Sequence, residues 1–152
     1  MSRIEARLRE IGVELPAVSA PVAAYIPATR VGNLVMTSGQ LPMVGGKLPR
    51  TGCLGGPVSE EDGAALARTA CLNALAAVKG VIGDLDQIKR VVRVVVFVQS
   101  TDDFHRQPIV ANGASEFLIQ VFGDAGKHIR SAVGTNALPL DAPVELELTV
   151  EV

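Results

Sequence analysis

The sequence contains no tryptophan and few other aromatic residues, which together make up 3% of its 152 residues. Because aromatic side chains are the usual stacking platforms for unpaired bases, single-stranded nucleic acid is a poor candidate partner. A positive excess is also missing, since 14 lysines and arginines stand against 16 aspartates and glutamates. Proteins that bind duplexes or anionic membrane surfaces usually carry such an excess. We therefore expect neither nucleic acid nor a membrane among the partners.

Cysteine is scarce as well, with only Cys53 and Cys71 present. Two cysteines are too few for a disulfide framework, which favours a reducing compartment. Residues 2–10 are charged, unlike a secretory signal peptide, and no apolar run reaches the length of a membrane span once charges and glycines are counted. We therefore expect a cytoplasmic protein, with Cys71 as a small core residue.

Motifs for phosphate and metal binding are missing too. The glycines of residues 45–56 lack the following lysine and serine or threonine of a phosphate-binding loop, so they predict a flexible loop. The two histidines, His105 and His128, lie far apart and without the spacing of a zinc site. We expect them at the surface or at helix ends, and we expect no bound metal.

Hydrophobic periodicity is present over most of the chain. Apolar residues make up 48% and charged residues 20%, as in an ordinary globular domain. Helices are predicted over residues 2–11, from Ser59 to Gly83, and over a segment that opens at residues 101–103 and includes residue 122. Strands are predicted over residues 25–30, 33–40, 88–99, 131–137 and 143–152.

The run at residues 88–99 is the strongest predicted strand. Alternation places four valines on one face, namely Val92, Val94, Val96 and Val98. The other face is mixed and holds Arg93, Val95, Phe97 and Gln99.

The order of these elements predicts an α+β domain. The two strands on either side of the last helix require a parallel, right-handed crossover, whereas the final two strands can form an antiparallel hairpin. We therefore expect a mixed sheet with both main helices on one face. The opposite face combines apolar and charged groups, which suits an oligomer interface better than open water.

Three segments carry a family resemblance. They are Tyr25 with residues 32–42 (Gly-Asn-Leu-Val-Met-Thr-Ser-Gly-Gln-Leu-Pro), residues 94–98 with Asp103-Phe104, and residues 130–134 (Arg-Ser-Ala-Val-Gly) with Leu138-Pro139 and the Val-Glu-Leu-Glu of residues 144–147. In this order and spacing they resemble the RidA/YjgF family, the reactive intermediate deaminases. The resemblance begins near residue 22. It divides the chain into an N-terminal helix and connector, residues 1–21, and a RidA-like domain, residues 22–152, as in a divergent branch with an N-terminal extension.

The resemblance implies a chorismate-mutase-like fold and a homotrimer with clefts between its subunits. It implies hydrolysis of a reactive 2-imino or enamino acid to a 2-keto acid and ammonia, without a metal or organic cofactor. The partner is then a small carboxylate substrate. A non-catalytic trimer that binds small carboxylates, as a sensor or partner module, is the alternative. An endoribonuclease is a further alternative that the charge balance disfavours.

The resemblance also assigns the candidate site residues. Arg130 matches the arginine that grips the substrate carboxylate, which a planar guanidinium can do through two parallel hydrogen bonds. Glu145 matches a strand glutamate that positions water or moves protons. The alternative for Glu145 is a place on the polar face of an alternating strand. Tyr25 matches a site tyrosine that polarises the imine nitrogen or closes the pocket, or it packs at an interface.

The remaining candidates are expected to line the cleft. Ser38 matches a serine of the substrate site, and Gly39 next to it allows close approach to the backbone. Ala132, two residues after Arg130, is counted with the substrate-binding residues. No histidine is placed by the sequence to activate Ser38, so we do not expect it to act as a nucleophile.

Overall fold

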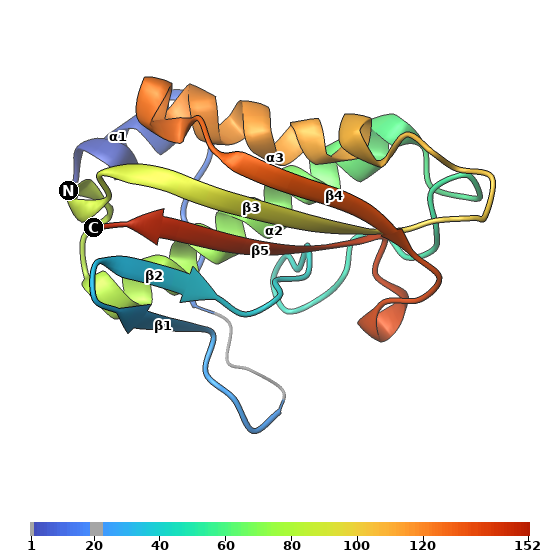
Figure 1. The fold of residues 1–152 in the computed structure, drawn as a ribbon, viewed down its shortest axis with the longest axis horizontal. Helices are drawn as coiled ribbons and strands as arrows, with labels where there is room; N and C mark the ends of the chain where they lie inside the picture. Colours follow the sequence, from blue (N-terminus) through green and yellow to red (C-terminus); the bar gives the residue numbers. More distant parts are fainter. Residues whose placement is uncertain (1, 19–22) are drawn as a thin grey trace.

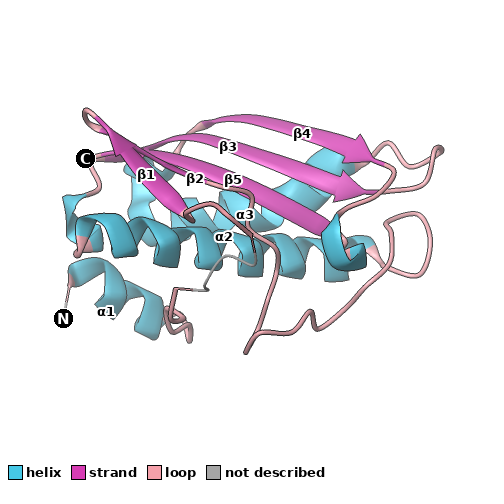
Figure 2. Cartoon of the chain, turned by 90° about the horizontal axis from the view of Figure 1, so that it is seen from below, coloured by secondary structure: helices cyan, strands magenta, loops and turns pink. Residues whose placement is uncertain are grey.

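The computed structural model describes residues 2–18 and 23–152 and confirms the predicted α+β class. A five-stranded sheet is covered on one face by helices, and its other face carries none in this part of the chain (Figure 2). In chain order the main elements are α1 (Arg3–Glu10), β1 (Ala28–Val31), β2 (Leu34–Thr37), α2 (Glu60–Ile82), β3 (Arg90–Gln99), α3 (Gln107–Phe122), β4 (Ile129–Thr135) and β5 (Val144–Glu151). Short 3-10 helices lie at Leu85–Gln87, Gly123–Gly126 and Pro139–Asp141.

The order of strands in the sheet is β1-β2-β5-β3-β4. β3 and β4 are parallel, as the crossover through α3 requires, and the other neighbours are antiparallel. The predicted hairpin of the last two strands is wrong, because β5 lies between β2 and β3 (Figure 1). The alternating side chains of β5 are compatible with this position. Its four apolar residues are almost completely buried, which a central strand allows, whereas β4 exposes Ile129 and Val133 and lies at the edge.

The predicted faces of β3 are wrong at one end. A β-bulge shifts the register between Val91 and Arg93, so that Val91 is buried and Val92 is the extra residue. Beyond the bulge the prediction is confirmed, since Val94, Val96 and Val98 are buried against the helices.

Gln99 was expected on the mixed face of β3 but is buried, with 5% exposure. Its Nε2 donates to Asp141 Oδ1 at 2.7 Å and to the carbonyl of Gly52 at 3.0 Å, and its Oε1 accepts from the N–H of Leu138 at 2.7 Å. This amide therefore connects the turn before β5 to the glycine-rich loop. A buried polar side chain needs such partners, and here both ends of the amide have them.

Capping explains where two helices begin. Ser59 Oγ accepts from the N–H of Asp62 at 3.1 Å, which confirms the predicted start of α2, and Ser2 caps α1 in the same way. The predicted opening of α3 at residues 101–103 is wrong, because α3 begins at Gln107. Thr101 donates its hydroxyl hydrogen to Asp103 at 2.7 Å, so this carboxylate is used in a turn before the helix.

Close contact between α2 and α3 depends on glycine. A Cβ at Gly113 of α3 would overlap the backbone of Ala64 in α2. Its distances to those backbone atoms would be shorter than the 3.0 Å that real Cβ atoms keep. By length and composition α2 could cross a membrane, but more than half of its most apolar stretch is buried inside the fold. Cys71 on α2 is fully buried, as predicted, and burial raises the pKa of its thiol.

The N-terminal helix packs into the same core as the rest of the chain. Ile4 and Leu8 are buried, and the N–H groups of Arg3 and Ile4 donate to the carboxylate of Asp86. These bonds, the one from Ile4 first, hold the pKa of Asp86 below its ordinary value. The predicted division between residues 21 and 22 lies outside the described residues.

Candidate functional site

Arg130 lies on the edge strand β4 and directs its side chain toward the helices. Ala132 on the same face packs against the core, whereas Ile129 and Val133 on the other face are exposed. Arg130 Nη1 donates to Asn112 Oδ1 at 2.8 Å and to Ser115 Oγ at 3.1 Å, both on α3. The guanidinium is therefore held against one helix face.

The partners of Arg130 carry no charge. Besides the amide and the hydroxyl, Nη2 donates to the carbonyl of Pro108 at 3.4 Å, a long hydrogen bond. None of the six ion pairs within residues 2–18 and 23–152 includes Arg130. The positive charge is thus positioned without being neutralised, which leaves it able to bind an anion.

Two residues that sequence reasoning did not assign to the site extend these contacts. Ser115 Oγ lies 2.8 Å from His128 Nε2, and His128 Nδ1 lies 2.7 Å from the carbonyl oxygen of Gly126. We call Asn112, Ser115, His128 and Arg130 the Arg130 network. The signal in the sequence was slight, because Asn112 and Ser115 are three residues apart on one helix face but only the fold brings that face to β4.

Glu145 lies on β5, on the face without helices, and is half-buried. Gly39 lies directly beside it, since a Cβ at Gly39 would overlap Glu145 Oε1. Paired backbone hydrogen bonds between Gln40 and Leu146 hold the two segments together. Burial first, and the charge of Glu147 second, raise the pKa of Glu145 above its ordinary value.

Ser38 completes this second group, which we call the Glu145 corner (Ser38, Gly39 and Glu145). Its hydroxyl donates to the carbonyl of Pro27 at 3.2 Å, and the backbone N–H of Ser38 donates to the same oxygen at 2.8 Å. Tyr25 lies two residues before Pro27, with 49% of its surface exposed. The hairpin therefore carries Tyr25 toward the same end of the sheet as Ser38.

Within one chain, the structure does not bring all the candidate residues together. Strand β3 separates β5 from β4, and in the register Arg130 pairs with Val94 whereas Glu145 pairs with Phe97. The two side chains also lie on opposite faces of the sheet. The candidates thus form two separate groups, Arg130 with Ala132 and the Glu145 corner with Tyr25.

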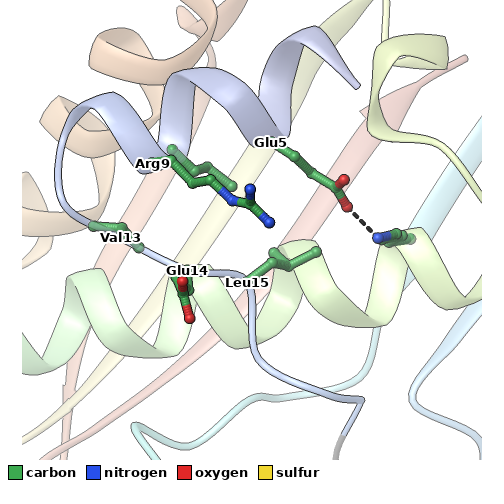
Figure 3. Close-up of a pocket in the computed structure, with 7 residues that line it drawn as sticks. Glu5, Arg9, Val13, Glu14 and Leu15 are labelled. Atoms are coloured by element: carbon green, nitrogen blue, oxygen red, sulfur yellow. Dashed lines mark hydrogen bonds and ion pairs between the residues drawn. The ribbon is translucent and has the colours of Figure 1, made fainter. Parts of the chain in front are cut away.

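Four cavities lined by described residues lie away from both groups, and two of them contain charged or titratable side chains of interest. One, of about 230 Å³, lies between α1 and α2 and contains the ion pair of Glu5 with Lys79 (Figure 3). Arg9 extends toward it from α1, and Leu15 lies across from Arg9. The other, of about 240 Å³, lies at the carboxyl ends of β3 and β4 and includes His105. None of the four is lined by a candidate residue, so they do not define the site.

Comparison with known proteins identifies relatives over nearly the whole chain. Residues 5–152 match the family described as "YjgF/chorismate mutase-like, putative endoribonuclease". Protein TCP17 of Trypanosoma cruzi is 42% identical over 98% of this chain and 94% of its own length. A 2-iminobutanoate/2-iminopropanoate deaminase of Dermatophagoides farinae is 29% identical over 91% of this chain and 93% of its own.

Two solved structures have nearly the same fold. The protein Atu1372 of Agrobacterium tumefaciens, of unknown function, is 43% identical with a TM-score of 0.92, over 98% of this chain and 92% of its own. A protein of Shewanella oneidensis described as a "putative endoribonuclease" is 36% identical with a TM-score of 0.94, over 98% and 99%. Since both matches extend over 98% of this chain, they include most of the N-terminal segment.

Proposed function

Because the chain belongs to the YjgF/chorismate mutase-like family, we propose that it hydrolyses small 2-imino or enamino acids to 2-keto acids and ammonia. The observation that carries the proposal is the guanidinium of Arg130, which is held by an amide, a hydroxyl and a carbonyl and by no carboxylate. A 2-imino acid has the carboxylate that such a group binds. The deaminase relative, at 29% identity, adds support for this class of substrate.

The reaction requires water and proton transfer at one carbon. Water adds to the C=N carbon while one of its protons passes to the nitrogen, which gives a carbinolamine. The proton of the carbinolamine hydroxyl then moves to the nitrogen, which leaves as ammonia while the carbonyl forms. With its raised pKa, Glu145 is suited to accept the proton from water and to return it to nitrogen. Arg130 orients the substrate, and holding the reacting groups in place contributes most of the rate.

The proposal includes assembly of several protomers, because the Arg130 network and the Glu145 corner are separate within one chain. A homotrimer would place the Arg130 network of one protomer beside the Glu145 corner of its neighbour. Exposed apolar side chains on the sheet face without helices support burial there, among them Val133 at 46% and Val31 at 61% exposure.

The test measures ammonia release from 2-iminobutanoate generated in situ by an amino-acid dehydratase. Wild type should accelerate hydrolysis above the spontaneous rate. Arg130→Ala should lower kcat/KM about 10- to 100-fold, since a hydrogen bond to a charged group contributes about 1.5–3 kcal/mol and 1.4 kcal/mol is tenfold. The matched control is Arg106→Ala, because Arg106 is exposed and paired with Glu60 outside both groups.

Equal rates for wild type and Arg130→Ala would remove Arg130 from the chemistry and overturn the proposal. Thermal stabilisation by 2-oxobutanoate without any turnover would instead favour a carboxylate-binding module.

The description of the matching family also favours a second candidate, an endoribonuclease. The charge balance opposes it, because 14 basic residues face 16 acidic ones. Cleavage of single-stranded RNA by wild type that weakens with added salt and persists in Arg130→Ala would establish this second activity in place of the first.

A further inference from the structure

In the neutral imidazole ring of His128, the two hydrogen bonds have one direction of donation. The carbonyl of Gly126, 2.7 Å from Nδ1, can only accept, so Nδ1 carries the proton. In the neutral ring Nε2 is then an acceptor, and Ser115 Oγ at 2.8 Å must donate to it. The same oxygen is left with its lone pairs toward Arg130 Nη1, which donates to it at 3.1 Å. The bonds thus run from Arg130 through Ser115 and His128 to the backbone.

This arrangement decides which edge of the guanidinium stays open. Both hydrogens of Nη1 are used, one by Asn112 and one by Ser115, and Nη2 makes only the long bond to Pro108. Within the described part of the chain no acceptor is bonded to Nε. The edge formed by Nε and Nη2 therefore remains for two parallel hydrogen bonds to a carboxylate.

The far end of the chain of bonds is anchored in the fold. Gly126 lies so close to α3 that a Cβ there would overlap the carbonyl oxygen of Leu118. The accepting carbonyl and the helix that bears Ser115 are thus fixed relative to each other. A guanidinium held in this way loses less freedom when it binds a ligand.

We propose that Ser115 and His128 are positioning residues that hold Arg130 with its Nε–Nη2 edge free for the substrate carboxylate. The inference rests on the proposed function, in which Arg130 binds that carboxylate. Neither residue touches the substrate, and both act through the guanidinium. The specificity that follows is for a planar carboxylate approaching this edge.

The kinetic test uses Ser115→Ala and His128→Phe, which remove the bonds, and Ser115→Thr and His128→Gln, which can restore them. The first two variants should raise the KM for 2-iminobutanoate and the Kd for 2-oxobutanoate about three- to tenfold, the effect of one hydrogen bond. Because the carboxylate is bound equally in ground and transition states, kcat should change less than KM. The two conservative variants should recover most of the wild-type affinity.

Controls separate this inference from misfolding and from the proposed function. His105→Phe, which changes the other histidine, should leave KM unchanged, and all variants should keep the wild-type Tm within a few degrees. If Arg130→Ala loses 2-oxobutanoate binding while Ser115→Ala and His128→Phe keep wild-type KM and Kd, the positioning role alone is wrong. If Arg130→Ala itself binds like wild type, the proposed function is wrong.

A spectroscopic measurement needs no substrate. Nitrogen NMR should find the neutral ring of His128 protonated at Nδ1, and separate, slowly exchanging signals for the Nη1 hydrogens of Arg130. Those signals should merge in Ser115→Ala. A ring protonated at Nε2 and not at Nδ1 would overturn the proposed direction of the hydrogen bonds, whatever the kinetics.

Discussion

The Arg130 network and the Glu145 corner differ in how their charged groups are held. Arg130 is held by neutral groups on α3, with hydrogen bonds at both terminal nitrogens. Glu145 lies against a glycine, and within residues 2–18 and 23–152 no hydrogen bond reaches its carboxylate. A group fixed by bonds is suited to orient a ligand, whereas a half-buried and unbonded carboxylate is suited to change its protonation.

The difference extends to what surrounds each charge. The Arg130 network is supported by helix packing, where backbone meets backbone at Gly113. In the Glu145 corner, the atoms that lie against Gly39 belong to the flexible side chain of Glu145 and not to the backbone. The same substitution, glycine to alanine, should therefore have different consequences in the two regions.

The largest effect is expected for Gly113→Ala. The added methyl group would overlap the backbone of Ala64, so α2 and α3 would have to separate. Overpacking of this kind costs roughly 1–3 kcal/mol, and an unyielding backbone places it near the upper end, about 3 kcal/mol. Urea unfolding measures the loss. Gly80→Ala is the control, because its Cβ would meet only a side-chain carbon of Val18 at 3.2 Å. Equal stability of both variants would contradict the close helix contact.

Gly39→Ala should spare the fold and reduce the activity. The methyl group would meet the end of the Glu145 side chain, which can rotate away at little cost to stability. If Glu145 transfers protons, displacing it should lower kcat on the order of 100-fold, within the range of general acid–base catalysis. Unfolding free energy and kcat should be measured on the same preparation. A wild-type kcat would show that the carboxylate need not lie where the structure places it.

Arg130→Lys distinguishes charge from geometry. Lysine retains the positive charge but lacks the planar guanidinium. It therefore cannot donate hydrogen bonds to Asn112 and Ser115 while it also binds a carboxylate through two hydrogen bonds. We expect kcat/KM to fall about tenfold, the loss of one charge-assisted hydrogen bond. Full activity in this variant would mean that a point charge is sufficient and that the Arg130 network is not needed for orientation.

The parts of the fold that depend on neighbouring residues were predictable from the sequence. The serine cap of α2 and the alternation along β5 both depend on short-range spacing. The central position of β5 was not predictable in this way. Strand order depends on which face each strand can bury once the whole sheet forms, and a single strand's pattern does not contain that.

The same distinction between local patterns and contacts made by the fold applies to the candidate site. Arg130, Glu145 and Gly39 were found through their resemblance to family motifs, which are local. Ser115 and His128 were missed because their contact joins the middle of α3 to the residue just before β4, thirteen residues apart in sequence. The bulge at Val92 and the burial of Gln99 are of the same kind, since both follow from partners far along the chain.

The smallest expected effect concerns stability at the Glu145 corner. Because the folded protein raises the pKa of Glu145 above its ordinary value of 4.5, the folded state binds this proton more tightly than the unfolded state does. The stability that Glu145 contributes is therefore present at pH below 4.5 and is lost as the pH rises through the raised pKa. Glu145→Gln should be slightly more stable than wild type near pH 7, and the difference should shrink near pH 4.

Urea unfolding at the two pH values measures that difference, with Glu147→Gln as the matched control. Removing the charge of Glu147 eliminates the second cause of the raised pKa but leaves burial, the first, in place. Glu147→Gln should therefore show a weaker form of the same pH dependence. If wild type is instead the more stable protein near pH 7, the carboxylate of Glu145 must have a partner that stabilises its charge, and the contrast between the two regions would be wrong.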